Sequence, residues 1–262
     1  MKRNSKDHNE KIIVIGGGVG PAAGVDLHRL IIEHTPHAVH DQDHLRVIHL
    51  SFSDLIADRT QALKNSTTEI VAHNMARLVE SILPTCIYFS SSAVVGVPCN
   101  TFHAKPIFDQ FVAKLAPHCD VITIINMIEQ TTKYISSIIP SSAYIGIMST
   151  TGTRNSRLYD NPLTNTGFKP IHCDDQMAIH SSIYDTQWGI KAVNGSSIQS
   201  KEILYNGLEE LYQKGAKAIL LACTEIPLVV KEPHYNGIPL VNPVVLLAKA
   251  MIKEATCRES FS

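Results

Sequence analysis

The 262-residue sequence has no excess of charge of either sign. It contains 23 lysine and arginine residues against 24 aspartate and glutamate residues, which gives a formal net charge of −1 with histidine neutral. A domain that binds nucleic acid normally carries a strongly basic face. Nucleic acid is therefore not an expected partner of this protein.

Long apolar runs are also missing. No run approaches the roughly 20 residues that a helix needs to cross a bilayer, so the sequence predicts no membrane association. Residues 1–10 are polar and contain no apolar segment of the kind that defines a secretory signal. The expected location is the cytoplasm.

Closely paired cysteines are the third absence. The six cysteines, at positions 86, 99, 119, 173, 223 and 257, form no CxxC pair and match no zinc module, so we expect no metal site. A chain of this length does not depend on disulfides, and in a reducing compartment its cysteines remain thiols. Most free cysteines are small buried hydrophobes, and the remaining question is whether any of these differ.

Short apolar segments alternate along the chain with longer helical patterns. Segments of four to eight residues that are apolar throughout indicate strands buried on both faces, as in parallel sheets covered by helices. The sequence therefore predicts an α/β protein. The expected strands are 11–17, 45–52, 93–98, 121–126, 143–148, 169–173 and 218–222, and the expected helices are 21–32, 67–83, 107–115, 202–214 and 243–255.

The chain contains a weak internal repeat. IIVIGGGVG near the start resembles YIGIMSTTG about 132 positions later, and VVGVPCNT resembles AILLACTE. The repeat predicts two similar lobes, each a mostly parallel sheet flanked by helices, with the active site in the cleft between them, although any two strand–helix units also look alike at this level. We assign residues 1–118 with 228–262 to the first lobe and 119–227 to the second.

A glycine-rich turn, GGGVGP at 16–21, follows the first expected strand and opens a helix. It does not fit the dinucleotide fingerprint, because Pro21 stands where the third glycine should be. Two interpretations remain: a tight turn that joins strand to helix, or a turn that lines a site for a small anionic substrate.

Cys99 and Cys223 stand out from the other cysteines. Each follows an apolar strand and is followed within two positions by a threonine, Thr101 or Thr224. Backbone N–H groups at such a strand end bind a carboxylate and favour thiolate over thiol. Two thiols on opposite sides of a bound carbon suit inversion of a stereocentre, with one thiolate removing a proton and the other thiol delivering one.

Seven motifs in order give the chain a specific resemblance. They are GGxGP at 17–21, DQDH at 41–44, IADRT at 56–60, PCNTFH at 98–103, STTGT at 149–153, IYDTQWGIK at 183–191 and ACTEIPL at 222–228. Together they resemble the aspartate/glutamate racemase family, and within it the aspartate racemase branch. The resemblance implies a two-lobed homodimer that racemises a small amino acid without a cofactor, with Cys99 and Cys223 as the catalytic pair.

The same resemblance implies a set of substrate-binding residues. Arg59 and Lys191 match positions that the family uses for substrate, and a guanidinium suits a planar carboxylate. The other expected binding residues are hydroxyl and amide side chains at strand ends or beside Arg59: Thr60, Asn100, Thr101, Thr150, Thr153 and Thr224. The chain departs from the usual family motifs at Val19, Ala57 and Asn242.

The leading hypothesis is a cofactor-independent aspartate racemase. A glutamate or broad-specificity racemase is the first alternative, but that branch typically has an Asp-Ser-Gly turn and Cys-Thr-His, where this chain has GGGVGP and Cys-Thr-Glu. The maleate isomerase and arylmalonate decarboxylase group is a further relative. An amino-acid-binding protein without activity is the alternative from another class, and it would need neither thiol.

Overall fold

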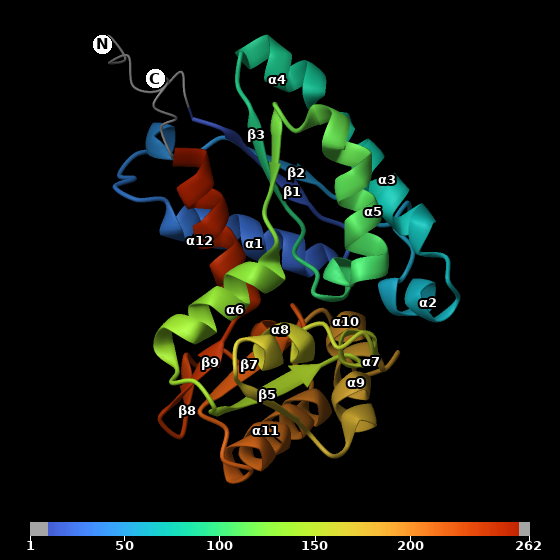
Figure 1. Ribbon diagram of the computed structural model, residues 1–262, viewed down its shortest axis with the longest axis vertical. Helices are drawn as coiled ribbons and strands as arrows, with labels where there is room; N and C mark the ends of the chain where they lie inside the picture. Colours follow the sequence, from blue (N-terminus) through green and yellow to red (C-terminus); the bar gives the residue numbers. More distant parts are fainter. Residues whose placement is uncertain (1–9, 257–262) are drawn as a thin grey trace.

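Two mostly parallel sheets, one in each lobe, organise the chain (Figure 1). The structure, a computed structural model, describes residues 10–256. The first sheet has the order β2-β1-β3-β4 and is fully parallel; the second has the order β6-β5-β7-β9-β8, in which only the β8–β9 pair is antiparallel. The predicted α/β class and the two similar lobes are confirmed.

The strands are short and the helices are mostly amphipathic. The strands are β1 Ile12–Gly16, β2 Val47–Leu50, β3 Ala93–Gly96, β4 Ile122–Ile124, β5 Tyr144–Ser149, β6 Lys169–His172, β7 Ala218–Ala222, β8 His234–Tyr235 and β9 Ile238–Val241. The helices are α1 Pro21–His34, α2 Arg59–Lys64, α3 Thr68–Glu80, α4 Leu83–Phe89, α5 Lys105–Leu115, α6 Met127–Ile138, α7 Thr151–Asn155, α8 Asp160–Asn165, α9 Gln176–Tyr184, α10 Ile190–Val193, α11 Ile198–Gln213 and α12 Pro243–Thr256. Single 3₁₀ turns are η1 Asp41–Asp43, η2 Thr101–His103, η3 Ala116–His118 and η4 Ile226–Leu228.

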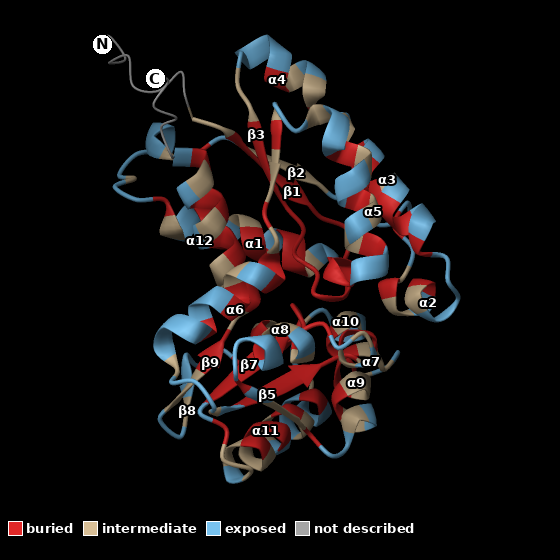
Figure 2. Cartoon of the chain, viewed as in Figure 1, coloured by how far each residue is buried: buried red, intermediate tan, exposed pale blue. Residues whose placement is uncertain are grey.

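The central strands β1, β3, β5 and β7 are almost entirely apolar because helices cover both faces of each sheet. In β1, Ile12 and Val14 pack on the face covered by α3 and α5, whereas Ile13 and Ile15 pack on the face covered by α1 and α12. The second sheet repeats this arrangement, with α9 and α11 on one face of β5 and β7 and α6 and α8 on the other. Figure 2 shows the central strands of both lobes as mostly buried between these helices.

The strand orders explain the internal repeat. β1 and β5 take the same place in their sheets, as do β3 and β7, and the starts of β1 and β5 lie 132 positions apart. Parallel strands of one sheet end at the same edge, so the loops after β3 and β7 lie at equivalent edges of the two lobes. These loops carry Cys99 and Cys223.

The predicted lobe boundary differs from the strand pairing at two points. We assigned residues 119–227 to the second lobe, but β4 pairs with β3 and so joins the first sheet. We also assigned residues 228–262 to the first lobe, but β9 pairs with β7 and β8 with β9, so both join the second sheet. α12 alone returns to the first lobe, where Leu247 and Met251 pack beneath β1 and β3. A two-residue strand and a proline-containing one give too short an apolar pattern to be assigned from the sequence. Cys257 lies outside the described residues.

Candidate active site

One small cavity collects residues from both lobes. It is lined by Val19, Arg59, Cys99, Asn100, Thr101, Thr150, Thr153, Tyr184, Lys191, Ala222, Cys223, Thr224 and Glu225. Nine of the ten predicted site residues are therefore brought together. Thr60, the tenth, lies beside the cavity, where its hydroxyl faces Gly152 of the other lobe.

The two candidate thiols enter the cavity from equivalent loops. Cys99 follows β3 and precedes η2, and Cys223 follows β7 and precedes η4. Both side chains are buried, with 6% of each residue exposed. The helical turns that follow them contain only three residues each, so neither loop provides the helix N-terminus that the sequence suggested.

Opposite charges lie beside the two thiols. The buried Arg59 belongs to α2, and its Nη2 donates a hydrogen bond to the carbonyl of Val19 at 3.0 Å. Burial opposes the charge on the guanidinium, but the interaction with the Cys99 thiol, together with Tyr184 and Asp58, leaves the Arg59 pKa raised. Cys99 therefore faces a permanent cation.

Cys223 faces an anion instead. Its Sγ donates to Glu225 Oε2 at 3.0 Å, and Thr224 Oγ1 donates to the same oxygen at 3.1 Å. Burial and the neighbouring Glu225 raise the Cys223 pKa well above its usual value. The sequence predicted that both loops favour thiolate, and for Cys223 this expectation is wrong, because a buried carboxylate lies against the sulfur.

Glu225 is held ionised by Lys191. Lys191 Nζ donates to Glu225 Oε1 and also lies over the ring of Tyr184, 5.3 Å from its centroid. Burial raises the pKa of Glu225, but Lys191, Cys223 and Thr224 outweigh that effect and hold it below its usual range. The Lys191 pKa is raised, since the attraction of Glu225 exceeds the opposing effect of burial.

Several buried polar atoms in and beside the cavity have no hydrogen-bond partner within residues 10–256. They include Arg59 Nε, Asn100 Nδ2 and Thr60 Oγ1. Leaving a buried donor unsatisfied costs about 1–3 kcal/mol, and more for a charged group. Donors in this state are suited to the carboxylate oxygens of a ligand.

Hydroxyl contacts join the two lobes around the cavity. Thr101 Oγ1 lies 3.0 Å from Thr153 Oγ1 across the lobes, and Tyr159 OH donates to Asn100 Oδ1 at 2.5 Å. Tyr184 OH donates to Asp58 Oδ2 at 3.1 Å. The cavity between these contacts has a free volume of about 10 Å³, which is space for about one water molecule. A ligand the size of an amino acid enters only if the lobes separate.

His103 supports the Cys99 loop without entering the cavity. It is buried, its Nδ1 lies 2.9 Å from the carbonyl of Cys99, and its Nε2 accepts from the N–H of Met127 at 3.3 Å. Burial lowers its pKa to about 4. The ring is therefore neutral at physiological pH and ties the Cys99 loop to the start of α6.

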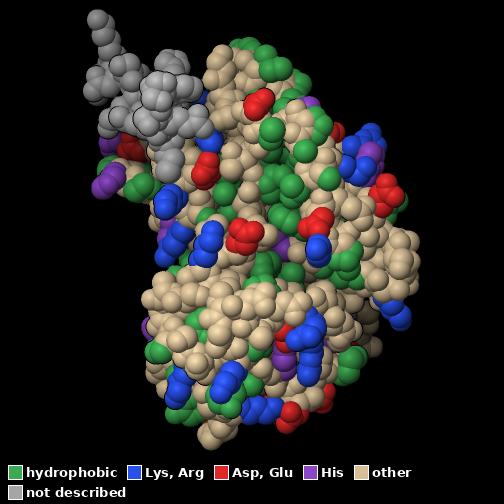
Figure 3. All heavy atoms as spheres, in the orientation of Figure 1, with side chains coloured by type: hydrophobic (Ala, Val, Ile, Leu, Met, Phe, Trp, Pro, Cys, Tyr) green, Lys and Arg blue, Asp and Glu red, His purple; other side chains and the backbone are tan. Residues whose placement is uncertain are grey.

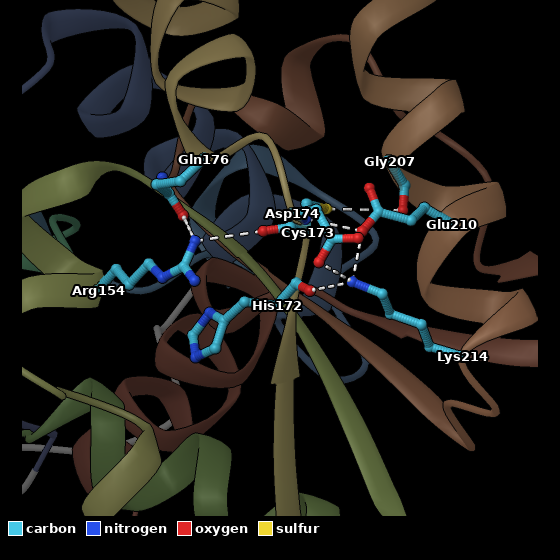
Figure 4. Close-up of polar contacts among 8 residues, drawn as sticks. All are labelled: Arg154, His172, Cys173, Asp174, Gln176, Gly207, Glu210 and Lys214. Carbon is cyan, nitrogen blue, oxygen red and sulfur yellow. Dashed lines mark hydrogen bonds and ion pairs between the residues drawn. The ribbon is translucent and has the colours of Figure 1, made fainter.

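The other described cysteines lie outside the cavity. Cys173 belongs to a polar cluster at the end of β6, where its Sγ contacts the carbonyl of Gly207 and its own carbonyl accepts from Arg154 Nη1 (Figure 4). Burial and the nearby Glu210 raise its pKa to about 12. Cys86 is buried in α4 and Cys119 is exposed. These surroundings support structural roles.

Sequence reasoning missed two residues of the cavity that carry titratable side chains, Tyr184 and Glu225. Both lie inside motifs that the sequence analysis quoted, IYDTQWGIK and ACTEIPL. A carboxylate two positions after a candidate thiol was the available signal for Glu225. For Tyr184, only the approach of α9 to α2 reveals its contact with the other lobe.

Neither a metal-binding cluster nor a membrane-spanning helix occurs between residues 10 and 256. No group of three or more His, Cys, Asp or Glu side chains there is arranged to hold a metal ion. None of the helices between residues 10 and 256 is long and apolar enough to cross a bilayer. On the face in Figure 3, cations and anions are interspersed over both lobes.

The chain is similar in sequence and in fold to known proteins. Residues 17–251 match the model of the family described as Asp/Glu/Hydantoin racemase. An aspartate racemase from Picrophilus torridus is 26% identical and superposes with a TM-score of 0.76 over 95% of each chain. A putative Asp/Glu racemase from Yersinia pestis gives 20% identity and a TM-score of 0.72 over 94% of this chain and 100% of that one. A glutamate racemase from Francisella tularensis shares the fold at 15% identity, with a TM-score of 0.60 over 98% and 86%.

Proposed function

This chain belongs to the Asp/Glu/hydantoin racemase family, and we propose that it interconverts L- and D-aspartate without a cofactor. One observation carries the proposal. Cys99 and Cys223, from equivalent loops of the two lobes, line the same buried cavity. This arrangement suits a reaction in which a proton leaves one side of a carbon and returns on the other.

The proposed reaction is a proton transfer in two steps. The thiolate of one cysteine removes the Cα proton, so that an S–H bond forms and the electron pair of the C–H bond remains on Cα. The thiol of the other cysteine then protonates the opposite face of Cα and becomes a thiolate. Atoms and charge balance, and the two cysteines have exchanged protonation states.

In the enzyme without substrate, the two thiols have different surroundings. The guanidinium of Arg59 lies in the same cavity as Cys99, whereas Glu225 accepts a hydrogen bond from Cys223 and raises its pKa, which favours the neutral thiol there. In the free enzyme we therefore assign the base to Cys99 and the acid to Cys223. Only one enantiomer of aspartate can react with this assignment. The other enantiomer requires Cys223 as the base and Cys99 as the acid.

The remaining cavity residues supply groups for a substrate carboxylate. Arg59 and Lys191 are cations, and Asn100, Thr101, Thr150, Thr153 and Thr224 are amide or hydroxyl side chains. Hydrogen bonds to the α-carboxylate stabilise charge that develops on Cα during the reaction. Two cations suit a substrate with a second carboxylate, which supports aspartate over an amino acid with an apolar side chain.

Direct assay tests the proposal. Incubation with L-aspartate, followed by chiral chromatography, should yield an equal mixture of enantiomers, and the reaction in D₂O should place deuterium at Cα. Testing L-glutamate, L-alanine and L-serine in parallel separates aspartate preference from broad specificity. Binding of aspartate with no deuterium exchange would favour the alternative, an amino-acid-binding protein. Full activity after exhaustive chelation and hydroxylamine treatment is expected, since the proposal includes neither metal nor pyridoxal phosphate.

Two expectations complete the proposal, the oligomeric state from the family resemblance and the location from the sequence. The protein is expected to form a homodimer and to reside in the cytoplasm. Light scattering coupled to size-exclusion chromatography measures the oligomeric state, and a mass near twice 28.8 kDa is the expected result.

A further inference from the structure

Resting on the proposed function, we infer that Glu225 binds the α-ammonium group of the substrate, taking it in exchange for the ammonium of Lys191. Lys191 is then free to bind a substrate carboxylate. The inference assigns a substrate-binding role to a residue that the sequence motifs did not single out.

The position of Glu225 is the first argument. It directly follows Thr224 in the loop after β7, and only 4% of the residue is exposed. One carboxylate oxygen contacts Lys191, and the other accepts from Cys223 and Thr224. The carboxylate therefore lies beside a candidate catalytic sulfur, where the substituents of a reacting Cα must also lie.

The chemistry of the cavity lining is the second argument. An amino acid brings an ammonium group as well as a carboxylate, and a buried ammonium needs an anion or several acceptors. Among the described residues that line the cavity, Glu225 is the only carboxylate. The cations Arg59 and Lys191 repel an ammonium group, so Glu225 is the side chain that can neutralise it.

Charge balance favours an exchange of partners over simple addition. Arg59, Lys191, Glu225 and one thiolate together carry no net charge. If Lys191 stayed on Glu225, the incoming ammonium would lack a full partner, and the second carboxylate of aspartate would depend on Arg59 alone. When the ammonium replaces Lys191, each carboxylate of the substrate has a cation and the ammonium has an anion. Both Lys191 and the substrate present primary ammonium groups, so the hydrogen-bond chemistry at Glu225 is preserved.

The glycine-rich turn makes room for this carboxylate. A Cβ at Gly20 would lie 2.5 Å from Glu225 Oε1, and Gly20 has φ +119°, a conformation that side chains disfavour. The turn therefore brings bare backbone against Glu225. This contact explains the last glycine of the GGGVGP motif, which lacks the dinucleotide pattern.

The experiment compares aspartate with succinate, which has both carboxylates but no amino group. Isothermal titration measures the affinity of each for the wild type and for Glu225→Gln. We expect the variant to bind L-aspartate about 10–150-fold more weakly, the range for loss of a charged hydrogen bond. Succinate affinity should stay the same or rise, because removing Glu225 removes an anion. Glu225→Asp should keep part of the preference for aspartate.

Gly20→Ala provides a second variant that leaves Glu225 in place. Gly20→Ala should lower the affinity for aspartate more than the affinity for succinate, because the new Cβ displaces the carboxylate of Glu225. Gly237→Ala is the matched control: its φ is +82° and nothing lies within 4 Å of the added Cβ. It carries similar backbone strain, so its ratio of aspartate to succinate affinity should equal that of the wild type.

Two results with Glu225→Gln would overturn the inference. One is an equal loss of affinity for aspartate and for succinate, and the other is an unchanged affinity for aspartate. The proposed function fails separately. If the wild type binds aspartate but exchanges no deuterium at Cα, the racemase proposal is wrong, while the ratio of affinities still reports on the ammonium site.

Discussion

At the scale of single residues, the two cysteines are chemically unlike although they occupy equivalent loops. A cation lies beside Cys99, and a carboxylate accepts a hydrogen bond from Cys223. A reaction that needs a base on one side and an acid on the other requires such a difference. The asymmetry comes from Arg59 of α2 and Glu225 of the β7 loop, one from each lobe.

Replacing either cysteine should stop racemisation. Cys99→Ala and Cys223→Ala each remove a group that moves a proton, and each should lower kcat by at least about 10²–10⁴-fold. Chiral chromatography of aspartate measures the rate, and circular dichroism checks the fold. Cys86→Ala is the control, because Cys86 is buried in α4 away from the cavity. Full activity in either single variant would exclude the two-thiol mechanism.

The carboxylate of Glu225 should control the protonation of Cys223. Glu225→Gln removes the anion that raises the Cys223 pKa and leaves Lys191 nearby, so that pKa should fall. The thiolate, which is the reactive form, would then appear at lower pH. Alkylation by iodoacetamide across a pH series, read for each cysteine by mass spectrometry, measures the shift. The profile of Cys173, whose high pKa has other causes, should not move; an unmoved Cys223 profile contradicts the prediction.

Much of the site could be predicted from sequence because its residues lie in short motifs next to strands. Cys99, Asn100 and Thr101 are contiguous, and a strand end fixes their location. The protonation state of Cys223 could not be predicted, because it depends on the rotamer of Glu225 and on the ion pair of Glu225 with Lys191, which lies 34 positions from Glu225 along the chain. Local electrostatics at a strand end suggested a thiolate, and a buried tertiary contact reverses that preference.

At the scale of elements, the sequence analysis located strands β1 to β7 and five helices but missed β8, β9 and the remaining helices. α9 has no clear helical stripe, and α2, α4, α7, α8 and α10 are too short to show one. α6 does have such a stripe, with Ile128, Thr131 and Ile135 buried, and sequence reasoning overlooked it. In the helix predicted over 67–83, not every apolar residue is covered: Met75, Leu78 and Val79 are buried, whereas Ile70 is 55% exposed. Periodicity identifies a helix, but its contacts with α5 decide which residues are covered.

The docking of α12 on β3 gives a test of how the C-terminal segment divides between the lobes. A Cβ at Gly96 would collide with the sulfur of Met251 and lie 3.0 Å from Leu247 Cδ1. Gly96→Ala should therefore cost about 1–3 kcal/mol of stability through overpacking, and Met251→Ala about 2–5 kcal/mol through its cavity. The double variant should lose less than the sum, because each change relieves the other. Urea unfolding measures all three.

Gly195→Ala is the control for that series, since nothing lies within 4 Å of its added Cβ. Its free energy of unfolding should stay within about 0.5 kcal/mol of the wild type. Strict additivity of Gly96→Ala and Met251→Ala would mean that the two side chains do not meet and that α12 packs elsewhere.

At the scale of the whole molecule, the two lobes enclose a site that is closed. The internal repeat and strand ends in the sequence predicted a cleft between lobes, and the cavity lining agrees. Nothing in the sequence indicates that the cleft is closed, because closure depends on contacts such as the Tyr184–Asp58 hydrogen bond, between residues 126 positions apart. A cavity of about 10 Å³ requires a motion of the lobes before an amino acid can bind.

The Tyr184–Asp58 hydrogen bond should set how often the lobes separate. Tyr184→Phe removes it at little change in volume, which should favour the open form by about 1 kcal/mol, or roughly 5-fold. Cys99 and Cys223 are almost fully buried, so a neutral thiol reagent should modify both about 5-fold faster in the variant. Saturating L-aspartate should slow both, whereas the exposed Cys119 should react at one rate throughout. An equal factor at the two cysteines identifies lobe opening, because a local effect of Tyr184 would change one more than the other. Unchanged rates, or acceleration of Cys223 alone, would show that this contact does not hold the lobes closed.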